Sequence, residues 1–257
     1  MSGMDPVAAG GFSTAAGHYA RSRPGYARPA VGLLKESIPA GPVLDLAAGT
    51  GILTGQLRRA GRDVVAAEPL PEMLAHLRRA LPEVPAVACV AEALALRDGS
   101  FAGVTVAQAF HWFDAPAAVA EVRRVLVPGG VLAMVFNVRD ESVPWVRDLV
   151  DLVERASGGR PYPGGRGPGW GDVVADAGGF GAPAVHRFDN PVASSPEALV
   201  RRVRSTSFVA VMAEEARERL VAEVVGLVGR TEELAGRPAF ADPHVTEVHL
   251  WAAGDGP

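Results

Sequence analysis

A short apolar run that leads into a glycine-containing turn constrains this chain most. The stretch is Val43-Leu-Asp-Leu-Ala-Ala-Gly-Thr-Gly-Ile-Leu-Thr54. Its first four residues are apolar apart from one acid, as in a buried parallel strand. Gly49 and Gly51 permit a tight turn that brings backbone close to a ligand, and residues 52–59 have the spacing of an amphipathic helix. The stretch predicts a strand–turn–helix unit whose helix N-terminus faces the turn.

The alternation of strand and helix continues along the chain. Strands are expected at 42–47, 63–68, 86–90, 103–107, 130–136, 184–190 and 244–251, and helices at 29–37, 52–60, 71–80, 115–125, 144–157, 169–175, 196–204 and 214–230. Asp114 with Pro116 is a good helix start, and Pro128-Gly-Gly130 is a good stop. The pattern predicts an α/β fold with a Rossmann-like, doubly wound, mostly parallel seven-stranded sheet.

The predicted elements divide the chain into three parts. Residues 1–28 form an N-terminal segment expected to fold over a ligand, and residues 29–190 with 240–257 form the Rossmann-like core. Residues 191–239 form a helical insertion before the last strand. Because ligands of open sheets bind outside the strand carboxyl ends, we expect this insertion to serve as a lid.

The missing third glycine narrows the choice of ligand. A dinucleotide fingerprint needs G-x-G-x-x-G, but the sixth position counted from Gly49 is Thr54. No Gly-Lys-Ser/Thr follows, which excludes a P-loop. Glu68 ends the next apolar run, near the ~20-residue offset at which an acid binds ribose hydroxyls. A ligand with ribose and adenine but without phosphate therefore fits best, with Asp45 and the backbone of 47–51 facing its charged amino-acid end.

Bulk properties favour a soluble enzyme. The net charge of -4 argues against a nucleic-acid partner, which requires a basic face. The single cysteine, Cys89, cannot form an internal disulfide, and we expect a buried thiol and a cytoplasmic location. No apolar stretch approaches ~18 residues, so no membrane span is expected. No cluster has metal-ligand spacing, so no metal is predicted.

Four segments together resemble the class I S-adenosylmethionine (SAM) dependent methyltransferases. They are Asp45-Leu-Ala-Ala-Gly-Thr-Gly51, Glu68-Pro69 with Met73, Ala91-Glu92, and Gln108-Ala-Phe-His-Trp-Phe113. The similarity is greatest to the small-molecule branch, which includes trans-aconitate-methyltransferase-like and bacterial natural-product enzymes. It extends from Tyr19 to about Trp251. The chain departs from such families at Ala47, where they usually have glycine. The resemblance implies the strand order 3-2-1-4-5-7-6 with an antiparallel seventh strand.

The resemblance also implies the site residues. SAM, with S-adenosylhomocysteine as its product, is expected to bind Tyr19, Asp45, Ala47, Gly49, Gly51, Glu68, Pro69, Met73, Ala91, Glu92, Gln108 and His111. Ala91 and Glu92 would lie at the adenine edge. Trp112, Phe113 and Arg23 are the expected substrate-pocket residues. His111 is the candidate catalytic base, because an unperturbed pKa of ~6.5 suits proton removal at neutral pH; the alternative is that it only shapes the pocket.

We therefore predict a SAM-dependent methyltransferase acting on a small molecule, a secondary metabolite or another carboxylate or hydroxyl acceptor. An enzyme that keeps the SAM site but catalyses cyclisation or elimination is the alternative, because binding SAM does not require use of its methyl group. Thr54 disfavours a nicotinamide-dependent oxidoreductase, and the lid-like insertion disfavours a non-catalytic binding protein. The sequence leaves open the substrate, the acceptor atom and whether the protein is a monomer or a homodimer.

Overall fold

The computed structural model describes residues 24–159 and 170–254 of the chain. It has two compact units. Within the described ranges, the first comprises residues 24–136, 170–188 and 246–254, and the second comprises residues 137–159 and 189–245. The turn that follows the first strand belongs to the first unit.

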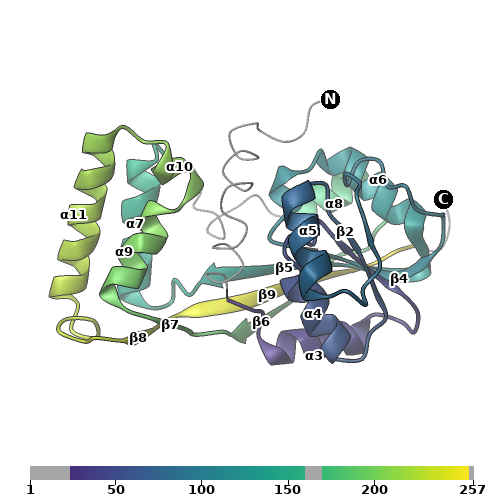
Figure 1. Ribbon diagram of the computed structural model, residues 1–257, viewed down its shortest axis with the longest axis horizontal. Helices are drawn as coiled ribbons and strands as arrows, with labels where there is room; N and C mark the ends of the chain where they lie inside the picture. Colours follow the sequence, from purple (N-terminus) through teal and green to yellow (C-terminus); the bar gives the residue numbers. More distant parts are fainter. Residues whose placement is uncertain (1–23, 160–169, 255–257) are drawn as a thin grey trace. The chain divides into compact units, whose positions relative to one another are not determined.

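A seven-stranded sheet organises the first unit (Figure 1). Its strands are β1 (Val43–Leu46), β2 (Val64–Ala67), β3 (Ala86–Val87), β4 (Phe101–Ala107), β5 (Leu126–Arg139), β6 (Ala184–Asp189) and β9 (His244–Ala252), and their order is β3-β2-β1-β4-β5-β9-β6. The pairs from β3 to β5 are parallel. The N–H of Ala253 donates to Gly130 and that of Asp140 to Pro243, so β9 runs antiparallel to β5. The predicted sheet and strand order are confirmed.

Helices with apolar faces cover this sheet. They are α3 (Arg28–Ser37), α4 (Ile52–Arg59), α5 (Pro71–Ala80), α6 (Ala115–Val125) and α8 (Trp170–Ala177). Leu34 of α3 and Leu57 of α4 are fully buried in one cluster with Val43, Val64 and other strand residues. The Asp114 side chain accepts a hydrogen bond from the backbone N–H of Ala117, which caps α6 as its sequence predicts.

The second unit consists mainly of helices packed on one another. They are α7 (Pro144–Ala156), α9 (Pro196–Arg204), α10 (Ser207–Ala210) and α11 (Glu214–Arg230), together with the strand pair β7 (Val192–Ser194) and β8 (Phe240–Asp242), which the sequence did not predict. Trp145, Leu149, Leu199 and Leu227 share its core. Hence α7 packs with the helices of the insertion. The lid role of 191–239 and the covering role of 1–28 stay predictions, and residues 1–23 lie outside the described part.

The third strand is shorter than predicted. The sequence favours a strand over 86–90, whereas β3 ends at Val87. Among the strands that the structure describes, β3 lies at the edge of the sheet beside β2, which ends where Ala67 pairs with Val87. Cys89 consequently lies past the strand and is half-buried, so the expectation of a buried core thiol is wrong. Val90 is 46% exposed.

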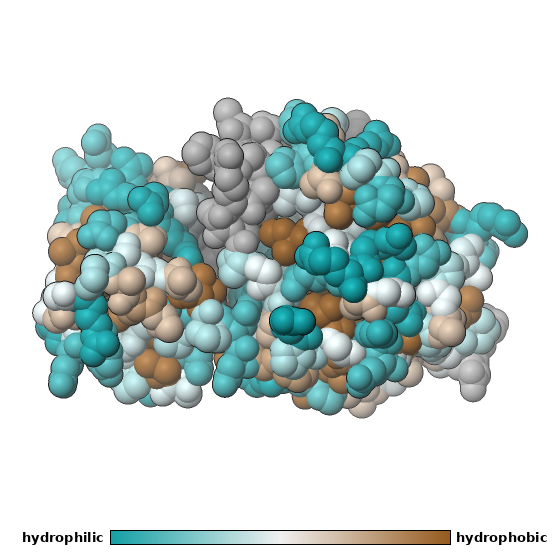
Figure 2. All heavy atoms as spheres, turned by 60° about the horizontal axis from the view of Figure 1, so that its bottom comes forward, coloured by the Kyte–Doolittle hydropathy of each residue, from teal (hydrophilic) through white to brown (hydrophobic). Residues whose placement is uncertain are grey.

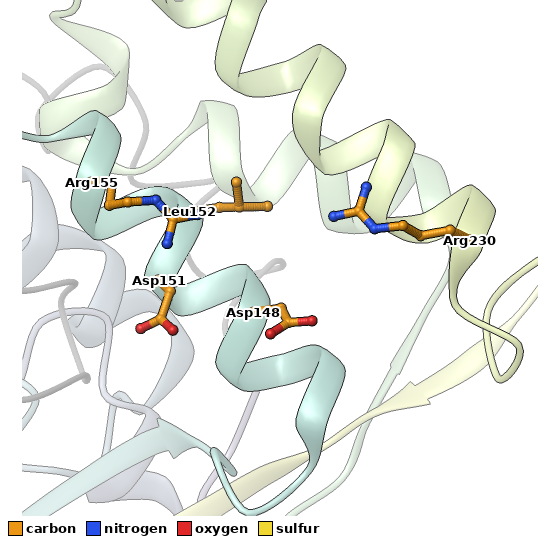
Figure 3. A pocket seen from close by; sticks show the side chains of 5 residues that line it. All are labelled: Asp148, Asp151, Leu152, Arg155 and Arg230. Atoms are coloured by element: carbon orange, nitrogen blue, oxygen red, sulfur yellow. The ribbon is translucent and has the colours of Figure 1, made fainter.

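The surface mixes polar and apolar groups. On the face in Figure 2, hydrophobic residues are scattered among hydrophilic ones. Within the second unit, a pocket between α7 and α11 is lined by Asp148, Asp151, Leu152, Arg155 and Arg230 (Figure 3). None of these is a predicted site residue. In the described ranges, no helix combines the length and the apolar character needed to cross a bilayer.

Candidate functional site

The carboxyl ends of three neighbouring strands bring the predicted cofactor residues together. Leu46 of β1 pairs with Ala67 of β2 on one side and with Val106 of β4 on the other. Ala47, Glu68 and Ala107 are therefore the next residues on three adjacent strands. In an open parallel sheet this edge is where ligands bind.

The backbone at this edge is strained at two positions. Ala47 has φ 53° and Gln108 has φ 57°, and no other non-glycine residue of the described ranges has a positive φ. The left-handed conformation costs an ordinary residue about 1–2 kcal/mol. Ala47 thus adopts the conformation that explains the usual glycine there. Strain of this kind persists where the surrounding structure holds it, and functional sites are common examples.

The two glycines of the turn, Gly49 and Gly51, have different roles. Both have positive φ, 58° at Gly49 and 86° at Gly51. A Cβ at Gly51 would lie 3.0 Å from Leu81 and 3.1 Å from Leu77, so this glycine permits helix packing. A Cβ at Gly49 would meet no atom within 4 Å in the described part of the chain beyond its own two neighbours. The space in front of Gly49 is therefore open to a ligand.

Asp45 is buried beneath the turn. Its carboxylate accepts hydrogen bonds from the hydroxyls of Thr54 (2.5 Å) and Thr105 (2.9 Å), and the residue is 1% exposed. Burial raises the pKa of Asp45 from 3.8 to about 6, although the two threonine hydrogen bonds oppose the shift. Direct contact between Asp45 and a ligand stays a prediction.

Glu68 joins the turns that follow β1 and β2. One carboxylate oxygen accepts the N–H of Gly49 (2.8 Å) and the other accepts the N–H of Leu70 (2.9 Å). Burial raises the pKa of Glu68, while both backbone hydrogen bonds lower it. A carboxylate has about four acceptor positions, so two remain. Glu68, the predicted ribose-binding residue, is thus fixed by a hydrogen bond from the glycine-containing turn of the same predicted site.

The predicted adenine edge follows β3. Ala91 is buried, and an oxygen of Glu92 accepts the backbone N–H of Asp114 at 2.9 Å. This bond ties the segment after β3 to the start of α6. Met73 of α5 is buried and Pro69 is half-buried.

The segment after β4 contains the candidate base. Phe110–Trp112 form a short 3-10 helix, η1. His111 is exposed, and its ring lies 4.6 Å from that of Trp112 between centroids. Phe113 meets Phe110 edge-on at 5.6 Å. The catalytic role of His111 and the pocket roles of Trp112 and Phe113 stay predictions. Tyr19 and Arg23 lie outside the described residues.

Sequence reasoning missed the partners of Asp45. In the sequence pattern Thr54 is the residue that breaks a dinucleotide fingerprint, and in the structure its hydroxyl donates to Asp45. An acid followed nine positions later by a hydroxyl across a strand–turn–helix unit could have suggested this bond. Thr105 lies on another strand, sixty residues along the chain, and carries no local signal.

Known proteins share this architecture. Residues 44–134 match the family described as methyltransferase domain. An uncharacterized methyltransferase of Mycobacterium tuberculosis is 39% identical over 241 residues, which cover 91% of this chain and 92% of the relative. An uncharacterized methyltransferase-like protein of Schizosaccharomyces pombe is 33% identical over 183 residues, covering 71% of this chain and 70% of that protein.

Solved structures agree on the fold. A candidate type II methyltransferase from Anaeromyxobacter dehalogenans is 26% identical with a TM-score of 0.59, covering 91% of this chain and 97% of that one. Phosphoethanolamine N-methyltransferase 2 of Haemonchus contortus, solved with S-adenosylhomocysteine, is 18% identical with a TM-score of 0.55 and covers 95% of this chain and 58% of that one. At that identity the likeness shows the fold alone.

The sheet order, the strained turn and the relatives that match most of the chain together define the class. This chain belongs to the class I SAM-dependent methyltransferases. The trans-aconitate-like branch within that class is not tested by these similarities.

Proposed function

We propose that this enzyme transfers the methyl group of SAM to a small-molecule acceptor, and that the carboxyl ends of β1, β2 and β4 form the cofactor site. The main observation in support is that Ala47 and Gln108, which follow the ends of two adjacent strands, both have a left-handed backbone conformation. When bound, SAM supplies an electrophilic methyl group on a sulfonium. The protein's task is then to align the reactants and exclude water.

The residues of this edge fit such a cofactor. The open space at Gly49 admits a ligand against the backbone, and Glu68 retains acceptor positions for two hydroxyls. The buried Asp45 carboxylate has hydroxyl partners that do not cancel its charge, which suits the ammonium end of an amino acid. Ala91 and Glu92 bind the base, and Gln108 faces the methionine portion.

The acceptor side is proposed to involve η1. Trp112 and Phe113 line the acceptor pocket, and His111 removes the proton from a hydroxyl or amine acceptor; an ionised carboxylate would need no base. A demethylmenaquinone methyltransferase of Renibacterium salmoninarum, named for a small-molecule substrate, is 38% identical over 99 residues, covering 38% of this chain and 42% of that protein. This local similarity supports a small-molecule acceptor.

The cofactor assignment is tested with Glu68→Gln. Loss of a carboxylate that holds two hydroxyls costs about 2–4 kcal/mol, taking ~1.5–3 kcal/mol for each charged hydrogen bond and allowing for solvent. We expect S-adenosylhomocysteine affinity, measured by titration calorimetry, to fall about 30- to 1,000-fold. Glu72→Gln, an exposed acid on α5, is the matched control and should bind normally. Unchanged affinity in Glu68→Gln would reject the ribose role.

The acceptor assignment is tested with methyl-labelled SAM. Incubation with fractionated small metabolites should yield a product that gains one labelled methyl group, with one S-adenosylhomocysteine formed for each product. On that acceptor, His111→Ala should slow turnover by ~10²–10⁴ if the imidazole is the base. A pocket role instead predicts weaker acceptor binding with a modest loss of rate. Label found only in protein or nucleic acid would contradict a small-molecule acceptor.

A further inference from the structure

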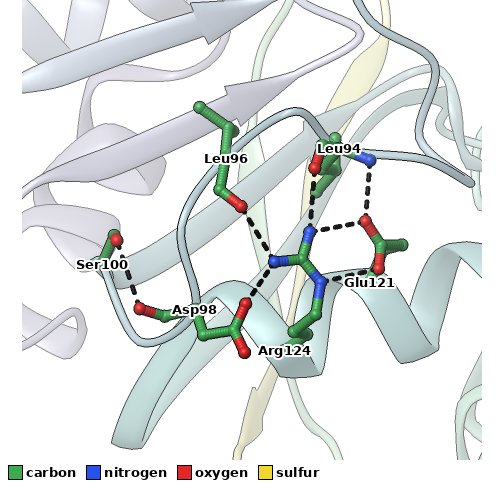
Figure 4. A network of polar contacts seen from close by, with 6 residues as sticks. All are labelled: Leu94, Leu96, Asp98, Ser100, Glu121 and Arg124. Carbon is green, nitrogen blue, oxygen red and sulfur yellow. Dashed lines mark hydrogen bonds and ion pairs between the residues drawn. The ribbon is translucent and has the colours of Figure 1, made fainter.

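The connection between β3 and β4 is attached to α6 by hydrogen bonds. Residues 88–100 contain no helix, and the segment instead lies along α6 (Figure 4). Its first attachment is the bond from the Asp114 N–H to Glu92 at the start of that helix. Its later attachments involve two residues further along α6, Glu121 and Arg124.

Arg124 binds this segment mainly through backbone atoms. One terminal nitrogen donates to the carbonyl of Leu96 at 2.8 Å and to the carboxylate of Asp98 at 2.5 Å. The other terminal nitrogen donates to the carbonyl of Leu94 at 2.8 Å and to Glu121 at 2.7 Å. Three points of the segment are therefore bonded to one guanidinium group.

Glu121 completes the arrangement. Its two oxygens accept the Nε and Nη2 hydrogens of Arg124, each at 2.7 Å, and one of them also accepts the backbone N–H of Leu94 at 2.7 Å. These bonds involve charged groups and are correspondingly strong. Leu94 thus has both its N–H and its carbonyl bound by the pair, two residues after Glu92.

We propose that Glu121 and Arg124 are positioning residues that hold Ala91 and Glu92 at the base-binding edge of the cofactor site. Neither is among the residues proposed to contact the cofactor. They act by fixing the segment just after Glu92 against α6. The inference rests on the proposed function, since it assigns the pair to the adenine half of the cofactor. It implies that the pair affects affinity for the base and leaves affinity for the amino-acid half unchanged.

A second arginine provides a matched control. Arg62 also binds a loop through carbonyl oxygens, donating to Ile38 at 3.1 Å, Pro39 at 2.5 Å and Gly41 at 3.2 Å. That loop precedes β1 and so lies at the amino end of the sheet, opposite to the proposed site. Arg62→Ala should weaken the fold without changing the affinity of the folded protein for the cofactor.

The experiment compares two ligands in each variant. S-adenosylhomocysteine carries the base, and S-ribosylhomocysteine lacks it. Calorimetry, with competition for the weaker ligand, gives both affinities for wild type, Arg124→Ala, Glu121→Gln and Arg62→Ala. We expect S-adenosylhomocysteine affinity to fall about 2- to 30-fold in the first two variants, the range for residues that act through others. S-ribosylhomocysteine affinity should remain within about twofold, and Arg62→Ala should retain both affinities.

The outcomes distinguish failure of the positioning role from failure of the proposed function. Equal losses for both ligands, or no loss for S-adenosylhomocysteine, would overturn the positioning role while leaving the proposed function intact. If the wild type bound neither ligand, the proposed function itself would be rejected. Should Arg124→Ala fail to fold, Arg124→Lys keeps the charge and loses the fork of donors, and the same selective loss is expected.

Discussion

Each unit of this protein contains a fully buried aspartate, and the two are held by opposite means. Asp45 in the sheet unit is 1% exposed and accepts hydrogen bonds from two neutral hydroxyls. Asp242 in the helical unit is 0% exposed and pairs with Arg139 at 2.8 Å and with Arg202 at 3.1 Å. His244 adjoins this cluster, and burial lowers its pKa.

The difference indicates that the charge of Asp242 has a structural role and that the charge of Asp45 has a functional one. Two guanidinium groups neutralise Asp242, so its carboxylate serves the fold of its own unit. The threonine hydroxyls donate hydrogen bonds to Asp45 without supplying a positive charge, and burial consequently raises the pKa of Asp45. A buried acid in this condition gains from a cationic ligand, and perturbed acids of this kind are typical of functional sites.

The largest effect is expected at Asp242. Asp242→Asn leaves two arginines without their buried counter-ion, and removing one partner of a buried ion pair costs about 3–5 kcal/mol. We expect the free energy of unfolding, measured in urea, to fall by that amount. S-adenosylhomocysteine affinity of the folded protein should not change.

The exposed pair of Arg204 with Glu218, at 2.7 Å in the same unit, provides the control. Glu218→Gln should cost less than about 1 kcal/mol, because exposed ion pairs contribute little. Equal losses of unfolding free energy in Asp242→Asn and Glu218→Gln would contradict the expectation that the buried ion pair contributes more to stability than the exposed one. A loss of cofactor affinity in Asp242→Asn would show that its role is not confined to the fold.

Asp45 should make stability depend on pH. Its folded pKa of about 6 exceeds the ordinary value of 3.8, so the folded protein binds the proton more tightly. The resulting stabilisation is complete below about pH 3.8 and is lost as the pH rises through 6. With 1.36 kcal/mol for each unit of pKa, the loss is about 3 kcal/mol.

Asp45→Asn removes this titration. The free energy of unfolding of the wild type minus that of the variant should decrease between pH 4 and pH 7, as followed by urea unfolding at each pH. A difference that stayed constant, or that increased with pH, would mean that Asp45 is not held in the protonation-favouring environment described here.

A smaller effect than at either aspartate is expected at Thr105. Thr105→Val keeps the shape of the side chain and removes one hydroxyl donor from Asp45, at a cost of about 1.5 kcal/mol. Because hydrogen bonds to an ionised acceptor are stronger, the cost should be greater at pH 8 than at pH 5. Thermal unfolding at both pH values measures this, and a cost independent of pH would separate Thr105 from the titration of Asp45.

The sequence predicted what depends on neighbours along the chain. The bounds of α6 follow from Asp114, Pro116 and the apolar spacing of the helix, and the structure confirms them at Ala115–Val125. The predicted length of β3 was wrong, because the end of an edge strand depends on where its partner β2 ends. The pair β7 and β8 was missed, since each strand is three residues long and its partner is distant in sequence.

The site shows the same division. The turn and Glu68 were recognisable, because glycine and acid positions carry the pattern. The hydroxyls that hold Asp45 were not, since Thr105 approaches from another strand. The bonds from Arg124 to the carbonyls of Leu94 and Leu96 could not be predicted either, because any residue type supplies a backbone carbonyl.

The bonds from Arg124 to backbone carbonyls affect which substitutions the segment can accept. Every amino acid carries a carbonyl, so the bonds from Arg124 to Leu94 and Leu96 do not depend on which residues occupy those two positions, whereas its bond to the Asp98 carboxylate requires an acid there. Ala93 and Ala95 are exposed and lie between bonded positions. Substitutions at Ala93 and Ala95 should therefore leave the bonds between Arg124 and the segment intact. A library randomised at these two positions would vary the surface next to the base-binding edge while the backbone path of the segment stays the same.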